Sequence, residues 1–147
     1  MKKISMIILA EDDEGHASLI KKNLRRAGIK NKIIRFKDGQ SALDYILNLK
    51  KNIKQKSDLS VVLLLDIRMP YISGIEILRK IKQDRVLKDI YTVIVTTTDD
   101  PAEIKKCYGL GCNAYVTKPV IYEQFIKTFY HLGIYLLNLN LPNLEND

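Results

Sequence analysis

VVLLLDIRMP, residues 61–70, is the stretch that decides the fold of this chain. Five apolar residues in a row end in a single acid, Asp66, and Pro70 follows shortly after. A continuous apolar run bounded by turn signals is typical of a strand buried on both faces of a parallel sheet. Because proline cannot extend a β-ladder, this strand must end near Asp66. Binding sites in open α/β sheets lie just outside the carboxyl ends of the strands, so Asp66 is a candidate functional residue, with a helix cap or a surface turn as the alternative.

Strand and helix signals alternate along the rest of the chain. Further strands are predicted at Ile4–Ala10, Lys32–Phe36, Tyr91–Thr97 and Ala114–Thr117. Helices are predicted at about Glu14–Ala27, from a cap at Asp38 to Leu47, at about Gly74–Gln83, from Asp100 to the Gly109 region, and from near Ile121. The segment Asn48–Ser60 is polar and rich in lysine, which predicts a surface loop. This alternation predicts one doubly wound α/β domain with a parallel sheet.

The composition is that of an ordinary globular domain. Of 147 residues, 46% are hydrophobic and 28% are charged, which is enough for one core. The net charge of +7 raises the question of a nucleic-acid partner. Acids are interleaved with the basic residues, however, and the motifs of RNA-recognition domains, zinc fingers and basic zippers do not occur. No apolar run approaches the length of a membrane span. We therefore expect neither nucleic acid nor a membrane as a partner.

Several residues bear on the cellular compartment and on alternative sites. The start, MKKISMIILA, resembles a short signal peptide, but Glu11–Glu14 follow where small residues should mark a cleavage site, which favours a buried first strand. Cys107 and Cys112 lack the spacing of a metal site and are expected to be reduced thiols, which indicates a cytoplasmic protein. His16 and His131 have no triad-like context and are expected on helix surfaces.

Acidic, hydroxyl and basic side chains occur at the carboxyl ends of the predicted strands. Glu11 and Asp12 follow the first strand, Asp66 follows the third, Thr96 lies at the end of the fourth, and Lys118 follows the fifth. In a parallel sheet these ends meet at one edge, with strands one and three as neighbours. Two carboxylates about 4 Å apart repel by about 4 kcal/mol at an effective dielectric near 20. Three carboxylates therefore need a cation, and an all-oxygen ligand set suits Mg²⁺.

The other two side chains at this edge suggest the chemistry. Lys118 and Thr96 suit a phosphoryl group that the metal also contacts. The predicted reaction is in-line phosphoryl transfer to a carboxylate oxygen, which gives an aspartyl phosphate. The alternative is that the three carboxylates are structural caps.

Four motifs together indicate a known family. They are ILAEDD (8–13), LLLDIRMP (63–70), IVTTTDD (94–100) and AYVTKPV (114–120), and they occur in the family's order on the corresponding strands. The chain resembles a response regulator receiver domain of the CheY-like, single-domain type, from Lys3 to about Tyr130. The resemblance implies a flavodoxin-like receiver fold with five parallel strands in the order 2-1-3-4-5.

The resemblance implies a role for each acidic residue of the site. Asp66 would accept a phosphoryl group from a sensor histidine kinase. Glu11 and Asp12 match the acidic pair that binds Mg²⁺ together with Asp66. The backbone carbonyl of Arg68 would be a further ligand of the metal.

Three more positions match the family. Thr96 corresponds to the switch hydroxyl, Tyr115 to the aromatic switch residue and Lys118 to the lysine of the site. Lys118–Pro119 corresponds to a peptide bond that is cis in the family, although only about 5–6% of X–Pro bonds in folded proteins are cis.

Three classes of function remain open. The leading one is a signalling module that catalyses only its own phosphotransfer and dephosphorylation and is otherwise no enzyme. The second is a phosphohydrolase with an aspartate nucleophile; such enzymes usually carry a second aspartate two residues later, where this chain has Arg68. The third is an interaction scaffold that is never phosphorylated, against which the complete set of acids, Thr96 and Lys118 argues.

The C-terminal segment has its own signals. We expect a receiver domain over residues 1–131 and an extension over 132–147 with no output domain. Output is then expected by protein–protein contact, whether with another protein, by relay to another phosphoacceptor or by self-association. The segment GIYLLNLNLPNLEND (133–147) and the Asn48–Ser60 loop resemble single-domain regulators that serve phytochrome-type sensor kinases.

Apolar residues on the last predicted helix reach more than one face. They are Ile121, Phe125, Ile126, Phe129, Leu132, Ile134, Tyr135, Leu136 and Leu137, followed by Leu139 and Leu141. Because a small monomer rarely exposes so much apolar surface, we expect a homodimer formed through the C-terminal helix and tail. The alternative is that the tail folds back onto its own domain.

Overall fold

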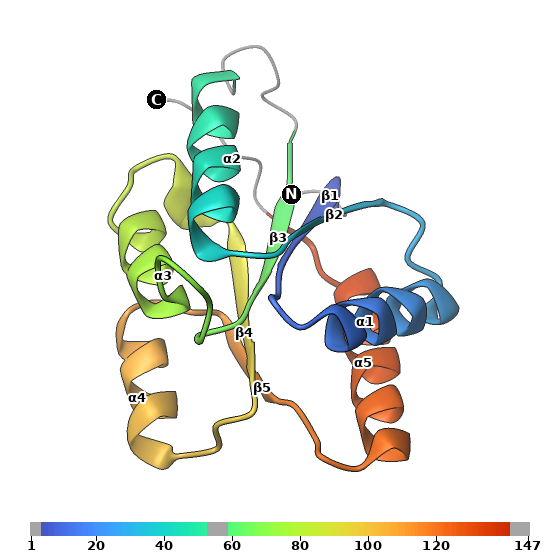
Figure 1. The fold of residues 1–147 in the computed structure, drawn as a ribbon. Coiled ribbons are helices and arrows are strands. Elements are labelled where there is room, and N and C mark those ends of the chain that lie inside the picture. The colour runs from blue at the N-terminus through green and yellow to red at the C-terminus, as the bar shows by residue number, and fades with distance from the viewer. Residues whose placement is uncertain (1–3, 53–58, 142–147) are drawn as a thin grey trace.

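A computed structural model of the chain describes residues 4–52 and 59–141 (Figure 1). The strands in these ranges are β1 (Met6–Ala10), β2 (Lys32–Phe36), β3 (Val61–Leu65), β4 (Tyr91–Thr96) and β5 (Ala114–Thr117). The helices are α1 (Glu14–Ala27), α2 (Gly39–Asn52), α3 (Gly74–Lys82), the short 3-10 helix η2 (Leu87–Asp89), α4 (Pro101–Gly109) and α5 (Tyr122–Leu137). None of the described helices combines the length and the apolar character that a membrane span requires.

The strands form one parallel sheet in the order β2-β1-β3-β4-β5. Helices α1 and α5 cover one face of the sheet, and α2, α3 and α4 cover the other (Figure 1). The predicted doubly wound α/β fold and its strand order are therefore confirmed. β2 lies on one side of β1, and β3 and the later strands lie on the other side. The carboxyl ends of the neighbours β1 and β3 therefore form the topological switch point.

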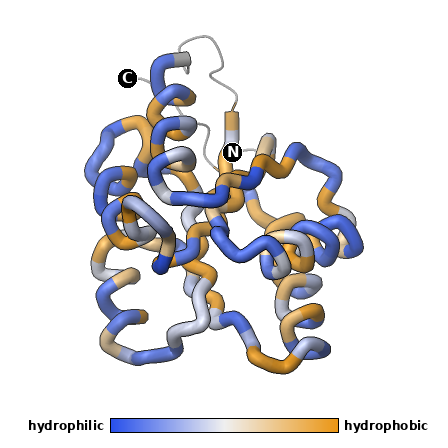
Figure 2. Tube along the Cα trace, in the orientation of Figure 1, coloured by the Kyte–Doolittle hydropathy of each residue, from blue (hydrophilic) through white to orange (hydrophobic). Residues whose placement is uncertain are grey.

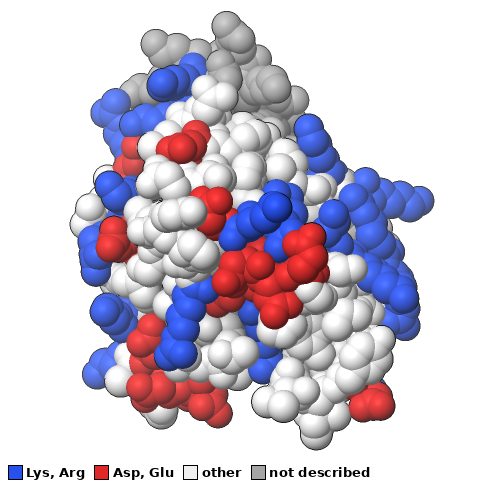
Figure 3. All heavy atoms as spheres, in the orientation of Figure 1, with Lys and Arg blue, Asp and Glu red and all other residues white. Residues whose placement is uncertain are grey.

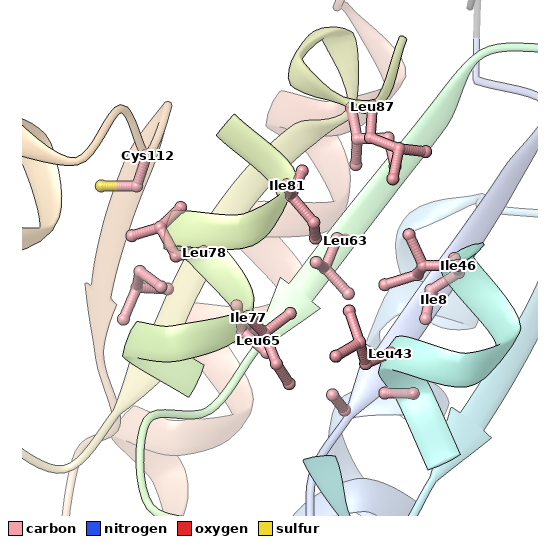
Figure 4. Close-up of a cluster of buried hydrophobic side chains, with 14 of the residues drawn as sticks. Ile8, Leu43, Ile46, Leu63, Leu65, Ile77, Leu78, Ile81, Leu87 and Cys112 are labelled. Carbon is pink, nitrogen blue, oxygen red and sulfur yellow. The ribbon is translucent and has the colours of Figure 1, made fainter. Parts of the chain in front are cut away.

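The central strand β3 explains why the sequence reads as an unbroken apolar run. All of its residues are buried, and hydrophobic residues concentrate on the strands of the sheet (Figure 2). Leu63 and Leu65 face the layer of α2 and α3, where they meet residues such as Leu43 and Ile77 (Figure 4). The intervening residues of β3 pack on the α1 and α5 side. A strand with helices on both faces has no polar side, so its sequence does not alternate between polar and apolar residues.

Helix α2 is longer than the sequence predicted. Part of the expected loop Asn48–Ser60 is helical, because α2 continues to Asn52. Leu49 extends the apolar stripe and packs against the core, and Lys50 Nζ lies 2.5 Å from Asp84 Oδ2. Tertiary contacts of this kind stabilise a helix whose local sequence is polar. The rest of the predicted loop, up to residue 58, lies outside the described residues.

The other predicted boundaries agree closely with the structure. β1 begins at Met6 rather than Ile4, β4 ends at Thr96 rather than Thr97, and α3 ends one residue earlier than expected. Differences of this size are common at the ends of helices and strands.

Helix α5 continues across residue 131, where the receiver domain was expected to end. Leu132, Leu136 and Leu141 are buried in the core between the sheet and α1. Gly133 packs so closely on α1 that a Cβ atom built on it would lie 2.6 Å from Cβ of Ala27. Several apolar residues that suggested a dimer interface therefore fold onto their own domain. The tail beyond Leu141 lies outside the described residues.

Candidate functional site

Backbone hydrogen bonds bring the predicted site residues to one edge of the sheet. Ala10 of β1 lies opposite Leu65 of β3, and the amide of Asp66 donates to the carbonyl of Ala10 at 3.0 Å. On the other side, the amide of Lys118 donates to the carbonyl of Thr96 at 2.7 Å. The parallel register thus places these residues as neighbours although they are far apart in the sequence.

Three carboxylates converge at the switch point. Ligand oxygens of Glu11, Asp12 and Asp66 all lie within 4.8 Å of one another. Glu11 is 1% exposed and Asp66 is 7% exposed, whereas Asp12 is open to solvent. Figure 3 shows the acidic cluster where β1 and β3 end, bordered by basic groups. A mixture of buried and exposed carboxylates leaves room for a cation that keeps some of its water.

Lys118 lies between the two buried carboxylates. Its Nζ donates to Asp66 Oδ2 at 3.0 Å and forms an ion pair with Glu11 Oε1. Burial alone would lower the pKa of Lys118, but the hydrogen bond to Glu11 and the charge of Asp66 outweigh it and raise the pKa. The lysine is therefore an ammonium over the whole physiological range of pH.

Glu11 has an unusual environment for a glutamate. Burial raises its pKa to about 7, against the opposing hydrogen bond and charge of Lys118, and the nearby charge of Asp66 adds to the rise. The amide of Asp13 also donates to Glu11 Oε2 at 3.1 Å. A carboxylate held at this pKa gains much from a further positive charge, which a metal ion would supply.

The loop after β3 holds Asp66 rigidly. The amide of Ile67 donates to Asp66 Oδ1 at 2.7 Å, and the amide of Gly74 donates to the carbonyl of Ile67 at 2.8 Å. A Cβ atom at position 74 would lie only 2.1 Å from the carbonyl oxygen of Asp66, so this close approach requires glycine. Ser73 caps α3 by accepting from the amide of Glu76 at 3.3 Å.

The remaining predicted residues surround the cluster. Thr96 is buried at the end of β4, next to β3 in the sheet. Tyr115 is half-buried, and its hydroxyl donates to the carbonyl of Thr98 at 2.8 Å. Burial and, to a smaller extent, the nearby Cys107 raise the pKa of Tyr115 to about 12. Arg68 is exposed in the loop after Asp66.

The Lys118–Pro119 peptide bond is trans, so the expected cis bond is not found. The trans form is favoured by about 0.5–1 kcal/mol for X–Pro bonds. The amide and the ammonium of Lys118 both reach their partners with the trans bond in place.

One residue of the site region escaped the sequence analysis, and a second lies in a different environment from the one expected. Arg35, at the end of β2, donates from Nε to the carbonyl of Glu11 at 2.9 Å and from a terminal nitrogen to Glu14 Oε2 at 2.5 Å. These hydrogen bonds hold the acidic loop in place. The sign of this role in the sequence is a charged residue near the end of a predicted strand. His16 is half-buried beside Lys118 and Phe125 rather than on a free helix surface.

Asp13 has a structural role rather than a ligand role. Its side chain caps α1 by accepting from the amide of His16 at 2.9 Å. This hydrogen bond is the main reason why the pKa of Asp13 lies below its usual value. The cap proposed at Asp38 is confirmed, since Asp38 accepts from the amide of Ser41. Asp100, where the next-to-last helix was expected to begin, caps α4 by accepting from the amide of Ala102.

The donor set fits a hard divalent cation. Three carboxylates in one cluster, two of them buried, form an oxygen-only site with an exposed side. The adjoining ammonium of Lys118 and the hydroxyl-bearing Thr96 are suited to an anionic group placed on Asp66. Such an arrangement can bind a phosphoryl group and a metal ion together.

Comparison with known proteins agrees with this geometry. A protein-family model described as the response regulator receiver domain matches residues 7–130. The chain is similar to a receiver domain structure from Rhodospirillum rubrum, with 43% identity, a TM-score of 0.90, and coverage of 96% of this chain and 99% of that one. It is similar to the Mn²⁺-bound form of Rcp1 from Synechocystis, with 26% identity, a TM-score of 0.75 and coverage of 94% and 99%. It is also similar to the phosphorylated cyanobacterial phytochrome response regulator RcpA, with 26% identity, a TM-score of 0.81 and coverage of 95% and 99%.

The raised pKa of Glu11 predicts a pH-dependent stability. Its pKa is about 7 in the folded protein and ordinarily 4.5, so between these values the folded protein keeps a proton that the unfolded chain has released. In metal-free solution, the free energy of unfolding should therefore fall for the wild type relative to Glu11→Gln as the pH rises through this window. The relative loss should be on the order of 3 kcal/mol, because one pKa unit corresponds to about 1.4 kcal/mol. Urea denaturation of both proteins across the window measures it; a difference that does not change with pH contradicts the assigned environment.

Proposed function

Because the chain belongs to the response regulator receiver family and acts in two-component signalling, we propose that Asp66 accepts a phosphoryl group from a sensor histidine kinase. The observation that carries this proposal is the ammonium of Lys118, held 3.0 Å from Asp66 Oδ2 at the centre of an acidic cluster. A carboxylate with a lysine at hydrogen-bonding distance can carry a phosphoryl group whose charge the lysine offsets.

The proposed reaction is an in-line displacement at phosphorus. A carboxylate oxygen of Asp66 forms a bond to phosphorus while the bond between phosphorus and the donor's histidine nitrogen breaks, and the nitrogen keeps the electron pair. Asp66 is rigidly held by its backbone contacts, which favours attack from a fixed direction. Lys118 stays protonated and offsets charge on a phosphoryl oxygen. The hydroxyl of Thr96 is available to hydrogen-bond another oxygen of the same group.

Mg²⁺ is the proposed metal of this site. Glu11, Asp12 and Asp66 would hold it, with the backbone carbonyl of Arg68 as a further ligand. Bound there, the ion would neutralise charge on the carboxylates and on the phosphoryl oxygens. The oxygen-only donor set supports the proposal, as does the Mn²⁺-bound form of the similar protein Rcp1. The same site would support slow loss of the phosphoryl group to water, which is the only hydrolysis we propose.

The switch is proposed to involve Thr96 and Tyr115. The phosphoryl group would draw the Thr96 hydroxyl toward Asp66, and the population of Tyr115 conformers would shift with it. The hydrogen bond from Tyr115 to the carbonyl of Thr98 supports this proposal, because it ties β5 to the loop that follows Thr96. A change at Thr96 would therefore reach α4 and β5.

The cognate kinase is proposed to be of the phytochrome type. The similarity to the cyanobacterial phytochrome response regulator RcpA supports this proposal over most of the chain. Phosphotransfer profiling against the histidine kinases of the source organism would test it. Preferential transfer from a kinase that lacks a phytochrome sensor region would contradict the assignment.

We also propose that the protein is cytoplasmic. Its partners are proposed to be proteins rather than nucleic acid or membranes. Cys107 and Cys112 are both buried and unpaired, which suits a reducing compartment. Cell fractionation tests the location, and recovery of the protein in a membrane fraction would contradict it.

A homodimer through the exposed side of α5 is proposed as the assembly. Ile134 and Tyr135 remain 38% and 48% exposed after the neighbouring leucines have joined the core. At the other end of α5, Ile121 and Tyr122 are more than half exposed. Exposed apolar residues along one helix suit a two-fold interface in which both subunits use the same patch.

Asp66→Asn should abolish phosphorylation by acetyl phosphate in the presence of Mg²⁺, because the amide cannot act as the nucleophile. Intact-mass measurement reports the modification directly. The control is Asp44→Asn, which changes an exposed aspartate of α2 that accepts a hydrogen bond from Gln40 of the same helix. It should be modified as fully as the wild type. Undiminished phosphorylation of the Asp66 variant would rule out this acceptor.

Thr96→Ala should still be phosphorylated on Asp66, but phosphorylation should change its affinity for a partner protein less than in the wild type. Couplings of this kind usually change affinity by about 5- to 150-fold, and the variant should lose most of that change. Partner binding before and after phosphorylation is the readout. A full phosphorylation-dependent change in the variant would exclude Thr96 as the coupling residue.

Ile134→Glu should weaken the homodimer at least tenfold, since a buried charge at a two-fold interface occurs twice. Sedimentation of the full-length protein measures the effect, and a point variant spares the buried leucines that a truncation would remove. Leu47→Glu, which changes an exposed leucine on α2, is the matched control. A wild-type protein that stays monomeric at high concentration with and without a phosphoryl mimic would exclude the dimer.

A further inference from the structure

His16 occupies a position beside the site that the reaction described above does not use. Its Nδ1 lies 3.3 Å from Nζ of Lys118. Its ring lies against Phe125 of α5, with ring centroids 5.2 Å apart and an interplanar angle of 33°. One histidine thus contacts both the lysine of the site and the core between α1 and α5.

The hydrogen-bond donors of Lys118 determine which tautomer of His16 is compatible with this contact. An ammonium has three hydrogen-bond donors and no acceptor. Glu11 Oε1 and Asp66 Oδ2 each take one, and His16 Nδ1 is in place for the third. Nδ1 must therefore be the unprotonated nitrogen, and the proton of the neutral imidazole lies on Nε2.

The surroundings hold the imidazole in this position. The amide of His16 donates to the capping side chain of Asp13, so the residue lies in the first turn of α1. Phe125, on which the ring packs, is buried and packs in turn against Phe129, with centroids 4.7 Å apart and the rings tilted by 45°. The ring is thus supported by the packed interface of two helices rather than by a loop.

An open hollow adjoins the same two residues. It has a volume of about 350 Å³ and is lined by His16 and Lys118 together with Thr97, Pro119 and Tyr122. Lys118 forms part of the wall of this hollow, and His16, on the same wall, is in place as its third hydrogen-bond partner. A flexible lysine side chain loses rotamer freedom when it is held in one position, so a third hydrogen-bond partner helps to keep the ammonium directed.

We propose that His16 is a positioning residue for phosphoryl transfer. Its neutral imidazole accepts a hydrogen bond from Lys118 and keeps the ammonium directed at the carboxylate of Asp66, where an oxygen of the incoming phosphoryl group will lie. The inference rests on the proposed role of Asp66 as acceptor. It differs from a packing role, in which any ring or branched apolar side chain against Phe125 would serve.

The contact itself is tested in the metal-free, unphosphorylated protein. Nitrogen-15 NMR of the histidine rings should show His16 with a proton on Nε2 and none on Nδ1, and Lys118→Met should remove this preference. His131, the only other histidine, is exposed on α5 and should not change. A proton on Nδ1 of His16, or a spectrum of His16 that Lys118→Met leaves unchanged, overturns the inference.

The role in the reaction is tested by a pair of substitutions. His16→Leu keeps apolar bulk on Phe125 but removes the acceptor, and should slow phosphorylation by acetyl phosphate about three- to tenfold. His16→Asn places a carbonyl oxygen near the position of Nδ1 and should restore most of the rate. His131→Leu is the control and should react like the wild type.

The outcomes separate this inference from the proposed function. A His16→Leu protein as fast as the wild type, or a His16→Asn protein as slow as His16→Leu, overturns the positioning role while Asp66 remains the acceptor. A wild type that takes no phosphoryl group on Asp66 overturns the proposed function instead, and the NMR experiment still decides the contact between His16 and Lys118.

Discussion

The ion pair of Lys118 with Glu11 and Asp66 is the interaction on which the site depends. Two carboxylates of the described structure are buried side by side, and burial of unpaired charge costs far more than the fold could tolerate. The ammonium compensates for this burial, and its raised pKa shows that the compensation exceeds its own desolvation. One positive charge against three acids still leaves an excess of negative charge. That excess is what makes the site receptive to a metal cation.

The fold provides this arrangement through one feature, the parallel sheet with its switch point between β1 and β3. Parallel register makes the ends of β1, β3, β4 and β5 meet, so residues from four distant segments share one edge. Helices on both faces bury the strands and keep water from the inner carboxylates. The loops at the edge carry the chemistry, while the helix caps at Asp13, Ser73 and Asp100 fix where each loop ends.

Much of this was predictable from the sequence because it depends on local patterns. The apolar run before Asp66, the strand–helix alternation and the capping residues determine the elements and their order, and the four motifs place the acids and Lys118. Contacts between distant segments were not predictable. Helix α2 extends because Leu49 packs on the core and Lys50 pairs with Asp84, and His16 is half-buried because Phe125 and Lys118 lie against it. The leucines of the tail were recognised as apolar, but only the packing of α5 on α1 shows which of them are buried.

Calorimetric titration of Mg²⁺ into the unphosphorylated protein shows whether the three carboxylates and Lys118 act together on a cation. We expect saturable binding of one ion per chain, loss of at least tenfold in affinity in Asp12→Asn, and a gain in affinity in Lys118→Met, because the lysine repels the ion and competes with it for Glu11. Absence of saturable binding by the wild type, or equal affinity in all three proteins, would contradict the claim that these carboxylates and Lys118 form one electrostatic unit.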